Sequence, residues 1–163
     1  VKNILITLGG TDYNGAVLDK IVSLLEENYD FDNTAVDVRK KRIDASEMNH
    51  LMCSTDLCIS GGGQTTEELA CLGVPGIGIC FADNQVLNLK GLHDAGSLYS
   101  IGRFEEENFS DKLFISINKL MSYSTRLQMS NIGQKLIDGK GALRVAEVVM
   151  NTILNQQHAN INI

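Results

Sequence analysis

Cysteine and histidine spacing in this sequence excludes the common metal-site patterns. The cysteines form no CxxC pair, and no histidine lies near them at ligand spacing. Each lies inside an apolar stretch, so we expect small buried hydrophobic side chains at Cys53, Cys58, Cys71 and Cys80. Reduced cysteines are typical of cytoplasmic proteins, so the sequence predicts a cytoplasmic location and no metal or other cofactor.

Long apolar runs and an excess of positive charge are also missing. No apolar segment is long enough to span a membrane, and no signal peptide is recognisable. The chain has 14 basic against 20 acidic residues, a net charge of -6. A negative domain repels a phosphate backbone at long range, so we expect neither a nucleic-acid partner nor a membrane span.

No constellation of catalytic side chains is recognisable either. His50, His93 and His158 do not cluster in the sequence. We find no Ser-His-Asp order and no pair of carboxylates that the sequence places in a cleft. We therefore expect no catalytic residue in this chain. The residues predict how a ligand is bound rather than how it reacts.

The 163 residues fit one domain, with 44% hydrophobic and 21% charged residues. Strand-like runs alternate with helical ones, which indicates right-handed crossovers and a parallel sheet covered on both faces, a Rossmann-like α/β fold. The expected strands are Asn3–Leu8, Thr34–Val38, Asp56–Ser60, Pro75–Cys80 and Leu98–Ile101. The expected helices are Gly15–Tyr29, Ser46–Cys53, Thr65–Leu72, Asn84–Ala95, Phe109–Met121, Ser124–Ile137 and Ala142–Gln156. We assign 1–157 to one domain and 158–163 to a frayed tail.

Three loops rich in Gly, Asn, Asp, Thr or Gln follow expected strands: Gly9–Asn14, Gly61–Thr66 and Ala82–Gln85. Ligands of parallel sheets bind at the carboxyl ends of the strands, so these loops should line one crevice. In the second loop, three glycines would let the backbone turn sharply and a ligand approach, and the helix start would offer free N–H groups. It is neither a Walker motif nor GxGxxG. A simpler alternative is a tight turn with Thr65 as the helix N-cap.

Polar side chains beside these loops have two interpretations each. Glu67 and Glu68 could complement the helix dipole, or one of them could accept hydrogen bonds from both hydroxyls of a ribose. Asp83 should cap the next helix, with Asn84 and Gln85 pointing toward the crevice, where amides suit sugar hydroxyls and phosphate oxygens.

The run DLCISGGGQTTEELACLGVPGIGICFADNQVLNLKGLHDAG at 56–96 resembles the C-terminal domain of GT-B-fold enzymes. It is most similar to the UDP-sugar hydrolase of pseudaminic acid biosynthesis (PseG/SpsG type), and more distantly to the MurG-type N-acetylglucosaminyltransferase. The segments ILITLGGTD at 4–12, 48–58, and IDGKGALRV at 137–145 resemble further motifs of the hydrolase.

The resemblance implies roles for particular residues. Glu68 would bind the ribose, with Glu67 as the cap, and the backbone of Ile43 would read the uracil edge. The remaining contacts to diphosphate and sugar would come from Gly10, Thr11, Gly62, Gly63, Gln64, Thr65, Asn84 and Gln85.

In the hydrolase family the proposed catalytic His belongs to an N-terminal domain. This chain begins Val1-Lys2-Asn3 and enters a strand at once, so we expect a fragment that lacks that domain and is inactive alone. The implied full-length reaction is hydrolysis of a UDP-linked 2,4-diacetamido-2,4,6-trideoxyhexose. The donor domain of a glycosyltransferase, or a non-catalytic module of a larger sugar-activating protein, remain alternatives.

Overall fold

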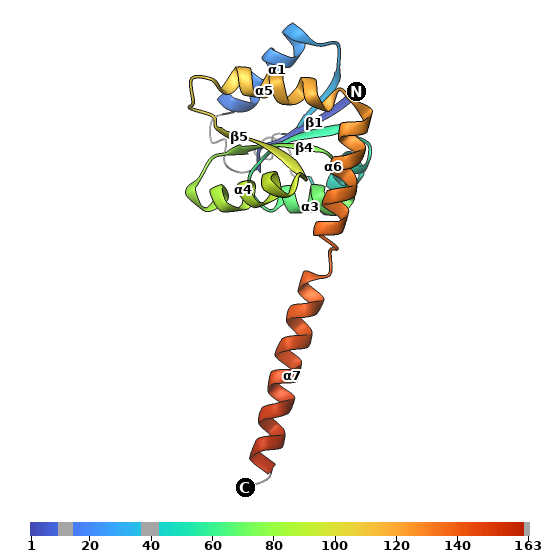
Figure 1. Cartoon of the computed structure of the whole chain (residues 1–163), viewed down its shortest axis with the longest axis vertical. Coiled ribbons are helices and arrows are strands. Elements are labelled where there is room, and N and C mark those ends of the chain that lie inside the picture. The colour runs from blue at the N-terminus through green and yellow to red at the C-terminus, as the bar shows by residue number, and fades with distance from the viewer. Residues whose placement is uncertain (10–14, 37–42, 162–163) are drawn as a thin grey trace.

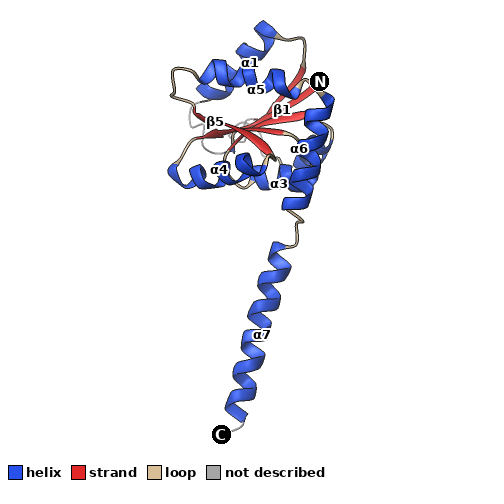
Figure 2. Cartoon of the chain, in the orientation of Figure 1, coloured by secondary structure: helices blue, strands red, loops and turns tan. Residues whose placement is uncertain are grey.

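A parallel five-stranded sheet forms the centre of the molecule (Figure 2). The computed structural model describes residues 1–9, 15–36 and 43–161, with the backbone alone at 33–36 and 155–161. Along the sheet the strands run in the order β2 (Asp32–Val36), β1 (Asn3–Thr7), β3 (Leu57–Gly61), β4 (Gly76–Cys80) and β5 (Leu98–Arg103). Every neighbouring pair is parallel, so all five carboxyl ends lie at one edge.

Helices cover both faces of this sheet, as Figure 1 shows. The elements after β1 are α1 (Ala16–Asn28), α2 (Ala45–Cys53), α3 (Thr65–Leu72), the 3₁₀ turn η2 (Asp83–Gln85), α4 (Val86–Ala95), α5 (Phe109–Leu120), α6 (Tyr123–Leu136) and α7 (Gly141–Ile161). α1 and α5 pack on one face, and α2, α3 and α4 on the other. The predicted α/β class, a parallel sheet with helices on both faces, is thereby confirmed.

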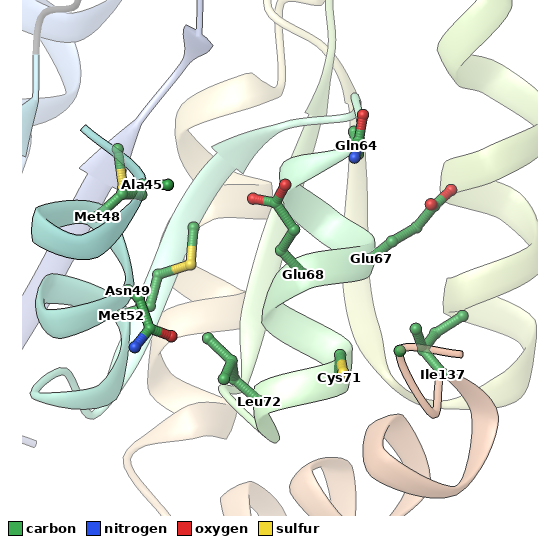
Figure 3. A pocket seen from close by; sticks show the side chains of 11 residues that line it. Ala45, Met48, Asn49, Met52, Gln64, Glu67, Glu68, Cys71, Leu72 and Ile137 are labelled. Carbon is green, nitrogen blue, oxygen red and sulfur yellow. The ribbon is translucent and has the colours of Figure 1, made fainter. Parts of the chain in front are cut away.

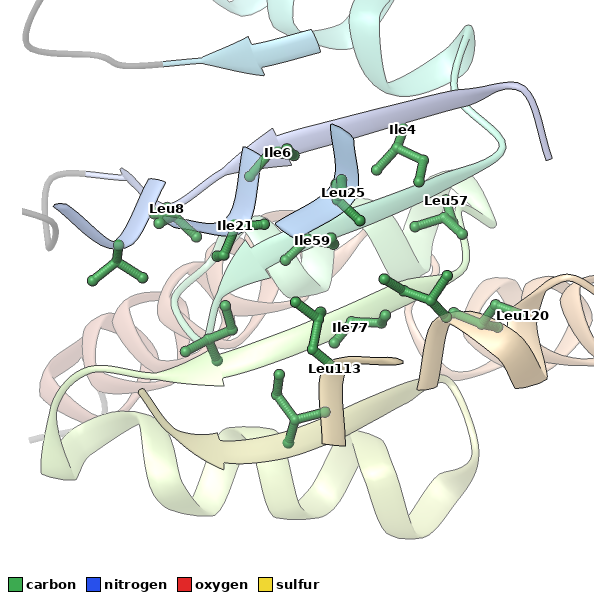
Figure 4. Packing of buried hydrophobic residues seen from close by; sticks show 14 of the residues in the cluster. Ile4, Ile6, Leu8, Ile21, Leu25, Leu57, Ile59, Ile77, Leu113 and Leu120 are labelled. Atoms are coloured by element: carbon green, nitrogen blue, oxygen red, sulfur yellow. The ribbon is translucent and has the colours of Figure 1, made fainter. Parts of the chain in front are cut away.

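Alternation along the buried strands supplies both layers of the core. Ile4 and Ile6 of β1 face α1 and α5, whereas Leu5 between them packs with Met52 of α2 and Leu69 of α3. Figure 4 shows the first of these clusters, in which the central strands meet α1 and α5. Strands buried on both faces read as unbroken apolar runs, which is why NILIT and LCISG look alike in the sequence.

α7 differs from the other helices because it stands away from the sheet layers (Figure 1). Between positions 143 and 154 its exposed large apolar side chains are Leu143, Val145, Val148, Val149, Met150, Ile153 and Leu154. The helix continues through Ile161, beyond the predicted end at Gln156. Before it, Asp138 accepts hydrogen bonds from both Arg144 Nη1 and Nη2, at 2.7 and 2.9 Å, and this pair fixes the start of the helix.

Several local predictions need correction. The helix N-cap near position 45 is Asp44, whose side chain accepts from Glu47 N, rather than Ser46. The element predicted over Asn84–Ala95 divides into η2 and α4. Of the cysteines, Cys58 and Cys80 are buried, but Cys53 is exposed and Cys71 is half-buried, because both occupy outer positions of short helices.

Candidate nucleotide-sugar site

The β3–α3 loop lies at the carboxyl edge of the sheet, but only one of its three glycines has the open surroundings that the prediction required. None of Gly61, Gly62 and Gly63 has a positive φ, so no left-handed turn requires them. A Cβ on Gly62 would lie 2.5 Å from Leu89 Cδ1, and one on Gly61 would lie 3.0 Å from Leu8 O. Only Gly63 faces open space, with no atom within 4 Å of such a Cβ. Two glycines therefore allow close packing, and one leaves room for a ligand.

Backbone N–H groups at the start of α3 are the main polar feature of this loop. Gly62 N donates to Ile79 O at 2.9 Å, and Thr66 N donates to Gly63 O at 3.1 Å. Between them, the N–H groups of Gly63, Gln64 and Thr65 have no hydrogen-bond acceptor in the part of the chain that the structure describes. Three adjacent free donors at the positive end of a helix dipole form a seat for an anion.

The alternative interpretation, in which Thr65 caps the helix, is wrong in its choice of cap. Thr65 is the first residue of α3, and Gln64 occupies the cap position without a side-chain hydrogen bond to the helix. It is Thr66, only 2% exposed, whose Oγ1 donates to Gly63 O at 2.7 Å. Because no side chain caps the helix, its first donors stay available to a ligand.

The two acidic residues of α3 point in different directions (Figure 3). Glu68 faces the space between α2 and α3, whereas Glu67 points to the other side of α3. Both carboxylates are exposed. The Glu68 side borders a cavity of about 520 Å³ that also reaches Gln64. Its other lining residues come from α2, α3 and the segment before α7: Ala45, Met48, Asn49, Met52, Glu67, Cys71, Leu72, Ile137 and Gly139.

Ile43 comes just before Asp44, the residue that caps α2. Its side chain is half-buried and packs against the cluster that contains Leu5 and Met52. This anchors the backbone at the entrance to α2, on the α2 side of the cavity. Its predicted contact with uracil through the backbone stays a prediction. Gly10 and Thr11, also predicted to contact the ligand, lie outside the described residues.

The loop after β4 does not match the expectation. Gln85 is 7% exposed, and its Oε1 accepts from Phe81 N at 2.8 Å, so this amide oxygen holds the loop instead of facing the crevice. Asp83 does not cap a helix; its carboxylate pairs with Arg103 of β5. Only Asn84 of the two predicted amides is exposed.

Sequence reasoning missed Asn88, one turn further along α4. Its Nδ2 donates to Gly62 O at 3.2 Å and to Thr66 Oγ1 at 3.1 Å, beneath the anion seat. In the sequence, its role is indicated only by an amide side chain near Leu89 and Leu92, the buried leucines of α4. A polar residue on the inner side of a helix needs a buried partner, and here that partner is the glycine loop.

Comparison with known proteins adds a relative to this geometry. The chain is 26% identical over 171 residues to the spore coat polysaccharide biosynthesis protein SpsG of Bacillus subtilis (strain 168). The similarity extends over nearly the whole length of this chain. The match covers 92% of this chain and 50% of SpsG, so the chain spans about half the length of this relative. The predicted resemblance to the SpsG type is confirmed. No protein-family model matches the chain.

Two solved structures match this chain over less than half of their own length. The spinosyn rhamnosyltransferase SpnG complexed with thymidine diphosphate matches with a TM-score of 0.67 at 17% identity, over 90% of this chain and 45% of SpnG. The UDP-GlcNAc 2-epimerase from Neisseria meningitidis bound to UDP-GlcNAc matches with a TM-score of 0.62 at 20% identity, over 92% and 44%. At these identities the likeness shows the fold: half of a GT-B architecture.

Among the described helices, none combines the length and the apolar character that crossing a membrane requires.

Proposed function

We propose that this chain is the UDP-sugar-binding domain of an enzyme that hydrolyses a UDP-linked 2,4-diacetamido-2,4,6-trideoxyhexose, in the synthesis of nonulosonic acids for a surface polysaccharide. The observation that carries the proposal is the set of free N–H groups on Gly63, Gln64 and Thr65, beside a cavity that Glu68 faces. The similarity to SpsG, a polysaccharide biosynthesis protein, supports the pathway class.

In this proposal the ligand lies across the start of α3. The diphosphate accepts hydrogen bonds from Gly63, Gln64 and Thr65, and the Glu68 carboxylate accepts from the two ribose hydroxyls. The uracil lies toward Ile43, and the sugar toward Asn84. Gly62 contributes by packing, because its own N–H is already bonded to Ile79 O.

The binding geometry also suggests how the domain assists the reaction. Water attacks the anomeric carbon, the bond from that carbon to the phosphate oxygen breaks, and UDP leaves with the bonding electrons. Fixed N–H donors stabilise the charge that grows on the leaving diphosphate, since they need no reorganisation during the step. A second domain supplies the catalytic histidine. We infer that the exposed apolar side chains of α7 contact that domain, since apolar side chains gathered outside the core mark interaction surfaces.

Calorimetry of this chain with UDP, CMP and ADP tests the binding proposal. We expect weak binding with a preference for UDP. Glu68→Ala should weaken UDP binding about tenfold or more, since a hydrogen bond to a charged group contributes roughly 1.5–3 kcal/mol. Glu67→Ala is the matched control: Glu67 also lines the cavity, but its carboxylate points away from that of Glu68, so this variant should keep UDP affinity. Equal responses to all three nucleotides would contradict the proposal.

A glycosyltransferase donor domain is the second candidate, and the fold shared with SpnG favours it. A non-catalytic nucleotide-sugar module is the third. Activity of the full-length protein separates them. Release of UDP with water as the only acceptor supports the hydrolase, release that requires an added acceptor supports the transferase, and binding without release supports the module.

A further inference from the structure

A small polar network lies directly beneath the anion seat. Asn88 Nδ2 donates one hydrogen to Gly62 O and the other to Thr66 Oγ1, at 3.2 and 3.1 Å. Thr66 Oγ1 in turn donates to Gly63 O at 2.7 Å. Each hydrogen that Asn88 Nδ2 and Thr66 Oγ1 donate in this network has one acceptor. The two carbonyls of the glycine loop are therefore bonded from the protein side.

The orientation of these carbonyls fixes the orientation of the free donors. In a trans peptide the C=O and the N–H of the next residue point to opposite sides, and the described residues contain no cis peptide. Gly62 O points inward to Asn88, so the N–H of Gly63 must point outward. Gly63 O points inward to Thr66, so the N–H of Gln64 also points outward.

We propose that Asn88 and Thr66 are positioning residues, which aim the N–H groups of Gly63 and Gln64 at the diphosphate. The inference rests on the proposed function for the identity of the ligand, and on the hydrogen-bond network for the geometry. Without the bond from Asn88, the peptide unit between Gly62 and Gly63 can rotate, because glycine restricts the backbone least. Gly63 O also accepts from Thr66 N at 3.1 Å, so the Thr66 hydroxyl adds a second bond to this carbonyl and supplies an acceptor that holds Asn88 in place. Preorganised donors bind an anion better than donors that must first be ordered.

The choice of side chains follows from the number of donors required. One amide nitrogen carries two hydrogens and can serve Gly62 O and Thr66 Oγ1 together. The Thr66 hydroxyl accepts one hydrogen bond and donates another, so it relays the contact to Gly63 O. A valine at position 66 keeps the shape and loses both bonds, whereas a serine keeps the hydroxyl.

The test compares Asn88→Ala, Thr66→Val and Thr66→Ser by calorimetry and amide NMR with UDP, inorganic pyrophosphate and uridine. Asn88→Ala and Thr66→Val should lose about tenfold or more affinity for UDP and pyrophosphate, and keep the affinity for uridine, which has no phosphate. Thr66→Ser should retain the wild-type values. Asn131→Ala, at an exposed position of α6, is the control. If Asn88→Ala does not fold, the comparison of Thr66→Val with Thr66→Ser tests the proposal.

Each outcome separates the two proposals. Wild-type affinity for UDP and pyrophosphate in both Asn88→Ala and Thr66→Val would overturn the positioning role and leave the UDP-sugar function intact. Pyrophosphate binding that depends on Asn88, with no uridine binding by the wild-type chain, would overturn the UDP-sugar function and support the positioning role. No shift of the Gly63 and Gln64 amides with any ligand would overturn both. UDP carries no second sugar, so a direct contact of Asn88 with that sugar cannot mimic the effect.

Discussion

The loops after β3 and β4 follow neighbouring strands at one edge of the sheet. They differ in whether their polar groups are hydrogen-bonded within the protein. After β3, the N–H groups of Gly63, Gln64 and Thr65 have no acceptor among the residues that the structure describes. After β4, Gln85 accepts from Phe81 N within the loop and Asp83 pairs with Arg103 of β5, so both side chains already have partners in the protein. A polar loop at a strand end is therefore a binding element only where its hydrogen-bonding groups are left over after folding.

A negative charge placed on each loop in turn should give the largest difference in UDP affinity between the two loops. Gly63→Asp puts a carboxylate at the open position of the seat, and like charges brought together cost several kcal/mol, so UDP affinity should fall on the order of 100-fold. The same charge at Asn84→Asp should cost less than tenfold, because that side chain is exposed and the seat is elsewhere. Calorimetry measures both. Equal losses would mean that the diphosphate lies between the loops.

Removing Gln85 tests the structural role of the β4 loop. Gln85→Ala leaves the Phe81 N–H without its acceptor, which should lower the free energy of unfolding by about 1–3 kcal/mol. Asn84→Ala, the neighbouring exposed amide, should change it by less than about 0.5 kcal/mol. Urea unfolding followed by circular dichroism distinguishes them. A stability loss in Asn84→Ala as large as that in Gln85→Ala would refute the assignment.

Alanine at two adjacent glycines tests the division of labour within the β3 loop. Gly62→Ala brings a methyl group to 2.5 Å from Leu89 Cδ1, so it should lower stability by about 1–2 kcal/mol through overpacking. Gly63→Ala meets no atom and should fold with nearly wild-type stability. Thermal unfolding of the two variants gives the comparison, and a larger loss in Gly63→Ala would contradict it.

A smaller effect concerns pH and the opposite edge of the sheet. Asp56 Oδ2 accepts from Lys2 N and Asn3 N at 2.6 and 3.0 Å, and these bonds hold the pKa of Asp56 below its usual value. A lowered pKa in the folded state adds stability that is complete above the unfolded pKa and is lost as pH falls through the folded one. The melting temperature should therefore fall more steeply below about pH 4 in the wild type than in Asp56→Asn. Parallel slopes would contradict this.

The fold was predictable from the sequence because its signals are local and repeated. Apolar runs such as NILIT end at glycine, and amphipathic stretches between them give the βα alternation, so element order and the parallel sheet follow. Helix α3 was predicted with the bounds that the structure has, since Gly73 adopts a positive φ that ends it. Glu68 borders the cavity beside α3, and its expected contact with a ribose stays a prediction.

Side-chain roles were less predictable, because they depend on partners distant in the sequence. Glycine is needed at position 62 because Leu89, 27 positions away, packs against it. The role of Gln85 depends on the turn that brings Phe81 N back to its side chain. Asn88 carries no motif of its own, and its role exists only once α4 packs beside α3. Composition predicted which loops are polar, but not which of them leave donors free.

A crystal structure of this chain with UDP tests the central claim most directly. We predict that the diphosphate oxygens lie within about 3.2 Å of the backbone nitrogens of Gly63, Gln64 and Thr65, with the ribose hydroxyls at the Glu68 carboxylate. A diphosphate bound at the loop of Asn84, or a ribose far from Glu68, would contradict the account.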